Sequence, residues 1–201
     1  MLKSRSALEN YRAQPGVDGA NGNRALRLGE VTDTRLVQIG IYPGGTTRVA
    51  AAVLPILGGP LPDSTVCAAV TVDHRIMRIA SDQYWVVGGD SGLEKQLRSA
   101  IPTDAGCVTS LDAARTRLLL EGRAVRALLG RLAPIDLDPL VFPVNAFAQT
   151  GIHHVPVLIL RSSEDRYELF ALRTFAASTW DVLLDAARLF GYDIVLPEKI
   201  T

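Results

Sequence analysis

The stretch Arg117-Leu-Leu-Leu-Glu-Gly-Arg-Ala-Val-Arg-Ala-Leu-Leu-Gly-Arg-Leu132 is the clearest guide to the architecture of this chain. Its beginning, 117–121, has the apolar centre and charged ends of a buried strand. Over 123–132 the large aliphatic residues recur at the spacing of one helix face, and they are Val125, Leu128, Leu129 and Leu132. Three arginines lie off that face, and they are Arg123, Arg126 and Arg131. The stretch therefore predicts a strand that leads directly into an amphipathic helix.

The chain on either side of this stretch continues the alternation of strands and helices. Before it, Cys107-Val-Thr-Ser-Leu111 has the pattern of a strand. After it, a proline-rich connection over 134–143 leads to strands near 145–150, 155–161 and 167–172. A last helix over about 176–190 would bury one apolar face, made of Trp180, Leu183, Leu184 and Ala187.

The first half of the chain predicts the same kinds of element. Strands are expected over 25–31 and 35–42, and a hairpin over 76–80 and 84–87. A first helix has its body over 48–54, with Thr46 or Thr47 as its cap and Pro55 ending or kinking it. A second helix over about 92–100 follows Asp90 or Ser91 as its cap.

Two matches between the halves suggest an internal duplication. Arg35-Leu-Val precedes a helix as Arg117-Leu-Leu does, and Asp82-Gln-Tyr84 opens a strand as Asp165-Arg-Tyr167 does. The first pair of strings is 82 residues apart and the second pair is 83 residues apart. This nearly equal spacing predicts one α+β domain over 24–201, built from two ferredoxin-like halves over about 25–103 and 104–195. Antiparallel sheets would carry helices on one face. Chance agreement between short apolar strings is the alternative explanation.

Residues 1–23 differ from the rest because they are rich in turn formers and poor in large apolar residues. We expect an extended or disordered arm that makes few contacts with its own domain and docks on a larger partner. Its scattered apolar residues would be the anchors. The candidate partner-interface residues are Leu2, Leu8 and Tyr11 in the arm, with Arg123, Arg126 and Arg131 on the helix.

Composition disfavours several classes of partner. The 201 residues carry 21 basic and 21 acidic side chains, so neither nucleic acid nor a membrane surface is expected as a partner. No apolar run reaches membrane-spanning length, and no signal peptide is recognisable, so we expect a cytoplasmic protein. Cys67 and Cys107 match no metal spacing and are expected to be buried, reduced thiols.

Every candidate for chemistry has a simpler structural interpretation. Gly89-Asp-Ser-Gly92 resembles a protease nucleophile string, but a capped helix start explains it better. His74, His153 and His154 are expected in turns or at the surface. Asp136 and Asp138 lie between prolines and favour a turn, and no phosphate-binding glycine motif occurs. We therefore predict no catalytic, cofactor-binding or metal-binding residue in this chain.

An ordered set of short motifs nevertheless resembles the gamma subunits of heterotetrameric sarcosine oxidases. The set covers about 100–191 and consists of Ser110-Leu-Asp-Ala-Ala-Arg-Thr-Arg-Leu118, Pro134-Ile-Asp-Leu-Asp-Pro139, Phe142-Pro143, Ala146-Phe-Ala-Gln-Thr150, Val157-Leu-Ile-Leu-Arg161 and Arg173-Thr-Phe-Ala-Ala-Ser-Thr-Trp180. Near the N-terminus, Arg5-Ser-Ala-Leu8 is similar to the family's Arg-Ser-Pro-Leu, with alanine in place of proline.

This resemblance implies a role that composition does not reveal. Such complexes oxidise sarcosine to glycine and hydrogen peroxide and transfer the one-carbon unit to tetrahydrofolate. Their other subunits, alpha, beta and delta, hold FAD, FMN, NAD, zinc and the folate site. The gamma chain would have a fold related to folate-binding aminomethyltransferases, carry no cofactor and be inactive alone.

Two alternatives stay open. The chain could serve a related complex that oxidises another secondary amine, such as N-methylglutamate. It could instead be a free-standing folate-binding protein of the aminomethyltransferase type, although it lacks the string Lys-Gly-Cys-Tyr-x-Gly-Gln found in one such branch.

Overall fold

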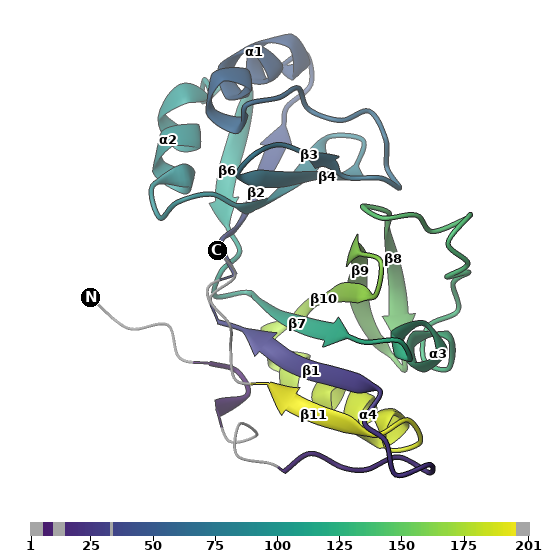
Figure 1. The fold of residues 1–201 in the computed structure, drawn as a ribbon. Helices are drawn as coiled ribbons and strands as arrows, with labels where there is room; N and C mark the ends of the chain where they lie inside the picture. The colour runs from purple at the N-terminus through teal and green to yellow at the C-terminus, as the bar shows by residue number, and fades with distance from the viewer. Residues whose placement is uncertain (1–5, 10–14, 33, 196–201) are drawn as a thin grey trace. The chain divides into compact units, whose positions relative to one another are not determined.

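A computed structural model describes residues 6–9, 15–32 and 34–195. The chain divides into two compact units. Residues 34–112 form one, here called the inserted unit, and residues 1–33 with 113–201 form the other, here called the terminal unit. Figure 1 shows a sheet with helices in each of them.

The inserted unit is one antiparallel sheet with two helices. Its strands have the order β3-β4-β5-β2-β6, and its elements are β2 (Leu36–Ile41), α1 (Thr46–Leu57), β3 (Ala69–Val70), β4 (His74–Ala80), β5 (Gln83–Gly88), α2 (Leu93–Ala100) and β6 (Gly106–Ser110). Val49 and Val53 of α1, Leu97 of α2 and Ile39 of β2 belong to the same buried cluster. Both helices therefore cover the same face of this sheet.

The terminal unit has a six-stranded sheet in the order β11-β1-β7-β10-β9-β8. Its elements are β1 (Leu26–Val31), β7 (Arg115–Glu121), α3 (Val125–Gly130), β8 (Phe147–Ile152), β9 (Val155–Ser163), β10 (Arg166–Leu172), the 3-10 turn η2 (Arg173–Phe175), α4 (Ala176–Ala187) and β11 (Tyr192–Val195). Neighbouring strands are antiparallel except β1 and β11, which run parallel. The apolar face predicted for the last helix is buried, with Trp180 and Leu183 in the core.

The α+β class with antiparallel sheets and helices on one face is confirmed. Both units also repeat one order of elements: a strand, a helix, three strands, a helix and a final strand. Their sheets share the order of the hairpin and of the strand beside it, β4-β5-β2 and β9-β10-β7. This order supports the duplication, which stays a prediction. Strand β1, assigned to the first half by its sequence position, pairs with β7 of the second.

The helix α1 begins earlier and ends later than expected. Thr46 is its first residue and Gly45 its cap, so neither Thr46 nor Thr47 is the capping residue. Only glycine fits at position 45, since an added Cβ would collide with the carbonyl oxygen of Ala105. Pro55 lies inside the helix, which ends at the left-handed Gly58.

The part of residues 1–23 that the structure describes contacts its own unit. Leu8 is 2% exposed and belongs to the terminal unit's core. The buried carboxylate of Glu30 accepts hydrogen bonds from the Ser6 hydroxyl and from the Ala7 backbone N–H. Val17 exchanges two backbone hydrogen bonds with Tyr192. The expectation of few contacts is therefore wrong for these residues, because Glu30 offers the segment a buried acceptor.

Candidate partner-binding surface

The helix α3 is held by its apolar face and presents its arginines to solvent. Val125, Leu128 and Leu129 are buried in the core of the terminal unit. Arg123, Arg126 and Arg131 are exposed, as the periodicity predicts. Within the described part of the chain, none of these three guanidinium groups lies in an ion pair. Arg126 of α3 and the two arginines at its ends are thus exposed positive charges.

The connection over 131–146, which follows α3, is built from side-chain-capped turns. The Asp136 carboxylate accepts the backbone N–H of Asp138 at 2.9 Å, and the Asp138 carboxylate accepts that of Leu140 at 2.9 Å. The Asp138 carbonyl oxygen also accepts the N–H of Phe142 at 2.7 Å. The two carboxylates therefore shape turns, as their proline neighbours predict.

Arg161 of β9 fixes the far end of this connection. Its side chain donates to the carbonyl oxygen of Phe142 at 2.8 Å and to that of Glu164 through Nη2 at 2.9 Å. The guanidinium carbon lies 5.8 Å from the ring centre of Tyr167, and Phe142 stacks on the same ring at 6.4 Å. Arg161 is 4% exposed. One buried cation thus joins the connection to the β9–β10 hairpin.

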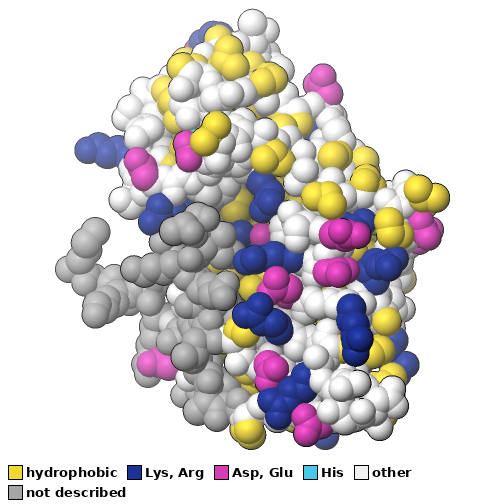
Figure 2. Space-filling view, in the orientation of Figure 1, with side chains coloured by type: hydrophobic (Ala, Val, Ile, Leu, Met, Phe, Trp, Pro, Cys, Tyr) yellow, Lys and Arg dark blue, Asp and Glu magenta, His cyan; other side chains and the backbone are white. Residues whose placement is uncertain are grey.

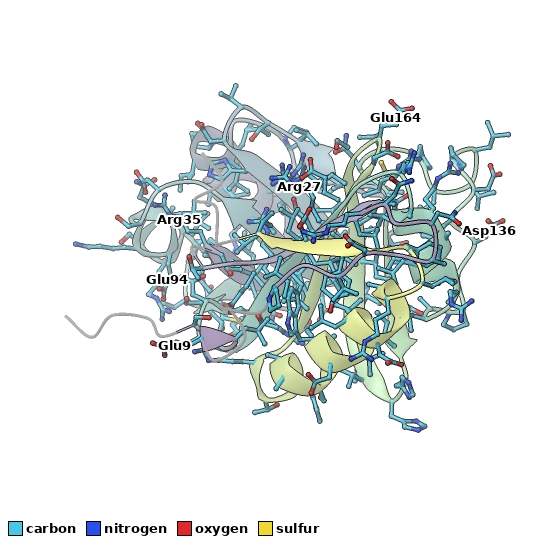
Figure 3. All side chains as sticks on the ribbon, turned by 60° about the horizontal axis from the view of Figure 1, so that its bottom comes forward. Glu9, Arg27, Arg35, Glu94, Asp136 and Glu164 are labelled. Atoms are coloured by element: carbon cyan, nitrogen blue, oxygen red, sulfur yellow. The ribbon has the colours of Figure 1, made fainter. Side chains whose placement is uncertain are left out.

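Between these two fixed points the connection turns apolar side chains outward. Leu140 is 94% exposed, Val141 62% and Val144 42%, while Leu137 and Phe142 are buried. Figure 2 shows apolar, acidic and basic side chains together at the edge of the molecule where this connection runs in Figure 1. In Figure 3, Asp136 and Glu164 lie at the periphery. We call the exposed set the α3 surface, and it consists of Arg123, Arg126, Arg131, Leu140, Val141 and Val144.

Burial also changes the pKa of Tyr167, whose ring contacts the Arg161 guanidinium group. Loss of hydration raises the pKa of Tyr167 above its usual range, and the positive charges of Arg161 and Arg126 oppose this rise. The hydroxyl of Tyr167 is buried without a hydrogen-bond partner among the described residues. The ring therefore contributes packing and a face for the cation.

The structure separates the predicted partner-interface residues into three groups. Arg123, Arg126 and Arg131 are exposed and near one another along the chain. Leu8 is buried in its own core and offers no surface to a partner in this structure. Leu2 and Tyr11 lie outside the described residues. The sequence did not identify Leu140, Val141 and Val144, although the Asp136–Asp138 pair between prolines indicated the turns that expose them.

The residues considered above for catalysis or metal binding lie in a loop before a helix, in a turn and on a strand. The string Gly89–Gly92 precedes α2, and Asp90 accepts the N–H of Gly92 at 2.7 Å. His153 and His154 form the exposed turn between β8 and β9, and His74 lies beside the Thr71 hydroxyl. The described residues contain no group of three side chains suited to hold a metal ion.

The expectation of two buried thiols is wrong, because Cys67 is only half-buried. Cys107 is exposed, because it points away from the helices at the sheet-edge strand β6. Its contact with the Tyr42 hydroxyl raises the pKa of that exposed tyrosine. No described helix has the length and apolarity required to cross a bilayer.

Gamma subunits of sarcosine oxidase are similar to this chain along most of its length. That of Corynebacterium sp. strain U-96 is 29% identical over 171 residues, which are 85% of this chain and 83% of the relative. That of strain P-1 is 27% identical over 88% of both. The resemblance found in the short motifs is thereby confirmed.

A solved structure of heterotetrameric sarcosine oxidase from Corynebacterium sp. U-96, in complex with pyrrole 2-carboxylate, contains a chain of the same fold. The TM-score is 0.82 at 29% identity, over 92% of this chain and 95% of that one. The glycine cleavage system aminomethyltransferase T from Bartonella henselae shares the fold at 15% identity, with a TM-score of 0.60 over 87% of this chain and 48% of that one. This agrees with the fold relationship that the resemblance implied.

The matched family spans the boundary between the two units. The profile described as the GCVT N-terminal domain matches residues 67–195, well over half of the chain. These residues include the hairpin of the inserted unit, β4 and β5, and everything from β7 to β11 in the terminal unit. The chain belongs to the family of GCVT N-terminal domains.

Proposed function

We propose that this chain is the gamma subunit of a heterotetrameric sarcosine oxidase and acts within it as a structural subunit. The complex would oxidise sarcosine to glycine and hydrogen peroxide and transfer the one-carbon unit to tetrahydrofolate. The chain alone would be inactive, and the complex would reside in the cytoplasm. Its partners would be the alpha, beta and delta subunits.

The observation that carries this proposal is the fit to a chain of the solved heterotetrameric oxidase. That fit extends over 92% of this chain and 95% of the other, with a TM-score of 0.82. The fit thus includes nearly all of the sequence described here and nearly all of that chain. A subunit of the same size and fold suits the same place in an assembly.

The cofactors of the reaction are assigned to the partners in this proposal. FAD, FMN, NAD, zinc and tetrahydrofolate would be held by the other subunits. In this chain Asp138 closes a turn and Arg161 holds a loop connection. Those side chains support a scaffold role.

The test is co-expression of a tagged chain with the alpha, beta and delta subunits from the same organism. We expect all four to be retained together and to produce hydrogen peroxide with sarcosine, while the tagged chain alone shows no flavin absorbance and no activity. Peroxide or reduced acceptor formed only with another secondary amine would assign the complex to that amine. Failure of the chain to retain any partner, together with tetrahydrofolate binding by the chain alone, would favour the free-standing folate-binding protein.

A further inference from the structure

We infer that the α3 surface is where this chain binds a larger subunit of the oxidase, through an apolar depression rimmed by carboxylates. The inference rests on the proposed function and assigns a place on this chain to the contact. It is carried by the charge of α3, by the rigidity of the 131–146 connection and by the exposure of that connection's apolar side chains.

The charge of the surface selects the chemistry of the partner. Arg123, Arg126 and Arg131 are exposed, and no described carboxylate lies within ion-pair distance of them. Asp136 and Asp138 of the connection are also exposed and keep their negative charges while they accept backbone N–H groups, so they offset the arginines only in part. Arginine pairs well with carboxylates at interfaces because its planar group donates two parallel hydrogen bonds. Carboxylates on the partner are therefore the complement.

The connection is preorganised, which lowers the entropy that binding would cost. Its turns are closed by Asp136 and Asp138, and its end is fixed by the buried Arg161. Leu140 at 94% exposure and Val141 at 62% lie between these fixed points. A rigid turn that holds apolar side chains in water suits a protein interface, whose centre is apolar and whose rim is polar.

A second copy of this chain fits the surface less well. In a two-fold contact the same patch meets itself, so six exposed arginines would lie in one interface. A different subunit avoids that repulsion. The relatives of this chain are named as one subunit among several of sarcosine oxidase, which is consistent with a different protein as the occupant.

The experiment compares four variants of the tagged chain, each co-expressed with the other oxidase subunits. Leu140→Asp and the double variant Arg126→Glu, Arg131→Glu alter the α3 surface. Val72→Asp and Arg48→Glu are the matched controls: Val72 is a 99% exposed valine of the inserted unit, and Arg48 is a half-exposed arginine of α1 paired with Asp104. Retention of partner subunits is measured at increasing salt, and circular dichroism confirms that every variant is folded.

We expect each α3-surface variant to weaken retention by about tenfold or more, since charge reversal and a buried aspartate both oppose the contact. The controls should remain within about twofold of the unchanged chain, as rim and non-interface substitutions do. Equal retention by folded α3-surface variants and controls would overturn the inference and leave the proposed function intact. A dimer of the chain alone that Leu140→Asp dissolves would overturn it in favour of a second copy. If even the unchanged chain retains no partner, the proposed function fails and this inference fails with it.

Discussion

Each unit contains an arginine that joins a hairpin to the connection before it, and the two arginines make corresponding contacts. In the inserted unit Arg78 donates to the carbonyl oxygens of Asp63 and Ser81 and lies 5.9 Å from the Tyr84 ring centre. In the terminal unit Arg161 contacts Phe142 and Glu164 and lies 5.8 Å from the Tyr167 ring centre. Both arginines pair directly with their tyrosine across the hairpin.

The two arginines differ in burial. Arg161 is 4% exposed, whereas Arg78 is half-buried and its hydrogen bonds are accessible to water. The same contacts therefore occur in different surroundings. A hydrogen bond lost in the interior leaves carbonyl groups without water, while one lost near the surface is replaced by water. Similar geometry should thus have unequal energetic weight in the two units.

A second difference appears one residue after each tyrosine, on the sheet face that points away from the helices. In the inserted unit Trp85 donates to the Gln38 side chain at 3.0 Å. In the terminal unit Glu168 pairs with Arg117 at 2.7 Å, with side chains 2% and 6% exposed. One unit has a neutral pair at this place and the other has a buried ion pair. Four predictions test what these differences mean.

The largest effect is expected from breaking the buried ion pair. Glu168→Leu would leave Arg117 buried and uncompensated, and we expect the free energy of unfolding to fall by about 3–5 kcal/mol. Gln38→Leu, the neutral counterpart, should cost about 1 kcal/mol. Urea titration of both variants measures the difference.

The double variant Arg117→Met, Glu168→Leu is the control for the ion pair. It removes both charges, so it should recover most of the stability that Glu168→Leu loses. A double variant as unstable as the single one would show that packing, and not the uncompensated charge, dominates.

The next largest effect is expected from removing Arg161 and Arg78. We expect Arg161→Ala to lower the free energy of unfolding by about 3 kcal/mol, because buried carbonyl groups lose charged donors. Arg78→Ala should lower it by about 1 kcal/mol. Urea titrations on the two variants give the ratio, and equal losses would contradict the role assigned to burial. Proteolysis near Leu140 should increase in Arg161→Ala alone.

A smaller effect is expected from the N-terminal segment that contains Leu8, which has no counterpart in the inserted unit. Leu8→Ala should cost about 2 kcal/mol, the lower end of the range for buried leucines. Thermal unfolding measures it, with Leu189→Ala as a matched control because Leu189 is 51% exposed. Equal stabilities of the two variants would mean that the segment is peripheral to the core.

The smallest effect concerns the tyrosine under Arg161. Tyr167→Phe removes a buried hydroxyl without a partner, so at neutral pH its stability should stay within about 1 kcal/mol of the unchanged protein. Burial raises the folded pKa of Tyr167. Its stabilising contribution is therefore present below the unfolded pKa of about 10 and is lost as the pH rises through the folded value. Urea titrations above pH 10 should show a steeper loss for the unchanged protein than for Tyr167→Phe, and parallel losses would contradict the pKa shift.

Periodicity predicted the elements that bury an apolar face. The spacing of Trp180 and Leu183 identified α4, and the Ile76–Ala80 and Tyr84–Val87 runs identified a hairpin close to the observed one. These signals work because each element has its own pattern of buried side chains. The α+β class follows from them.

The features that periodicity missed depend on partners distant in sequence. Strand β11 is short, and it forms by pairing with β1 at the other end of the chain. Leu8 is one large apolar residue in a mostly polar segment, and its neighbour Ala7 donates its backbone N–H to Glu30, which is distant in sequence. On the α3 surface the arginines were predictable from the helix, whereas the outward direction of Leu140 depends on turns that Arg161 completes.

The pairing of β1 with β7 has a consequence for the order in which the chain folds during synthesis. Arg27 of β1 meets Glu121 of β7 across a sequence separation of 94 residues. At about 5–20 residues per second, β1 waits roughly 5–20 s after its own synthesis before its partner strand exists. The inserted unit is completed during that interval, and its strands pair among themselves. In a growing chain, β1 is thus an unpaired strand with exposed Leu26, Leu28 and Val31, and a ribosome-associated chaperone would be expected to bind it.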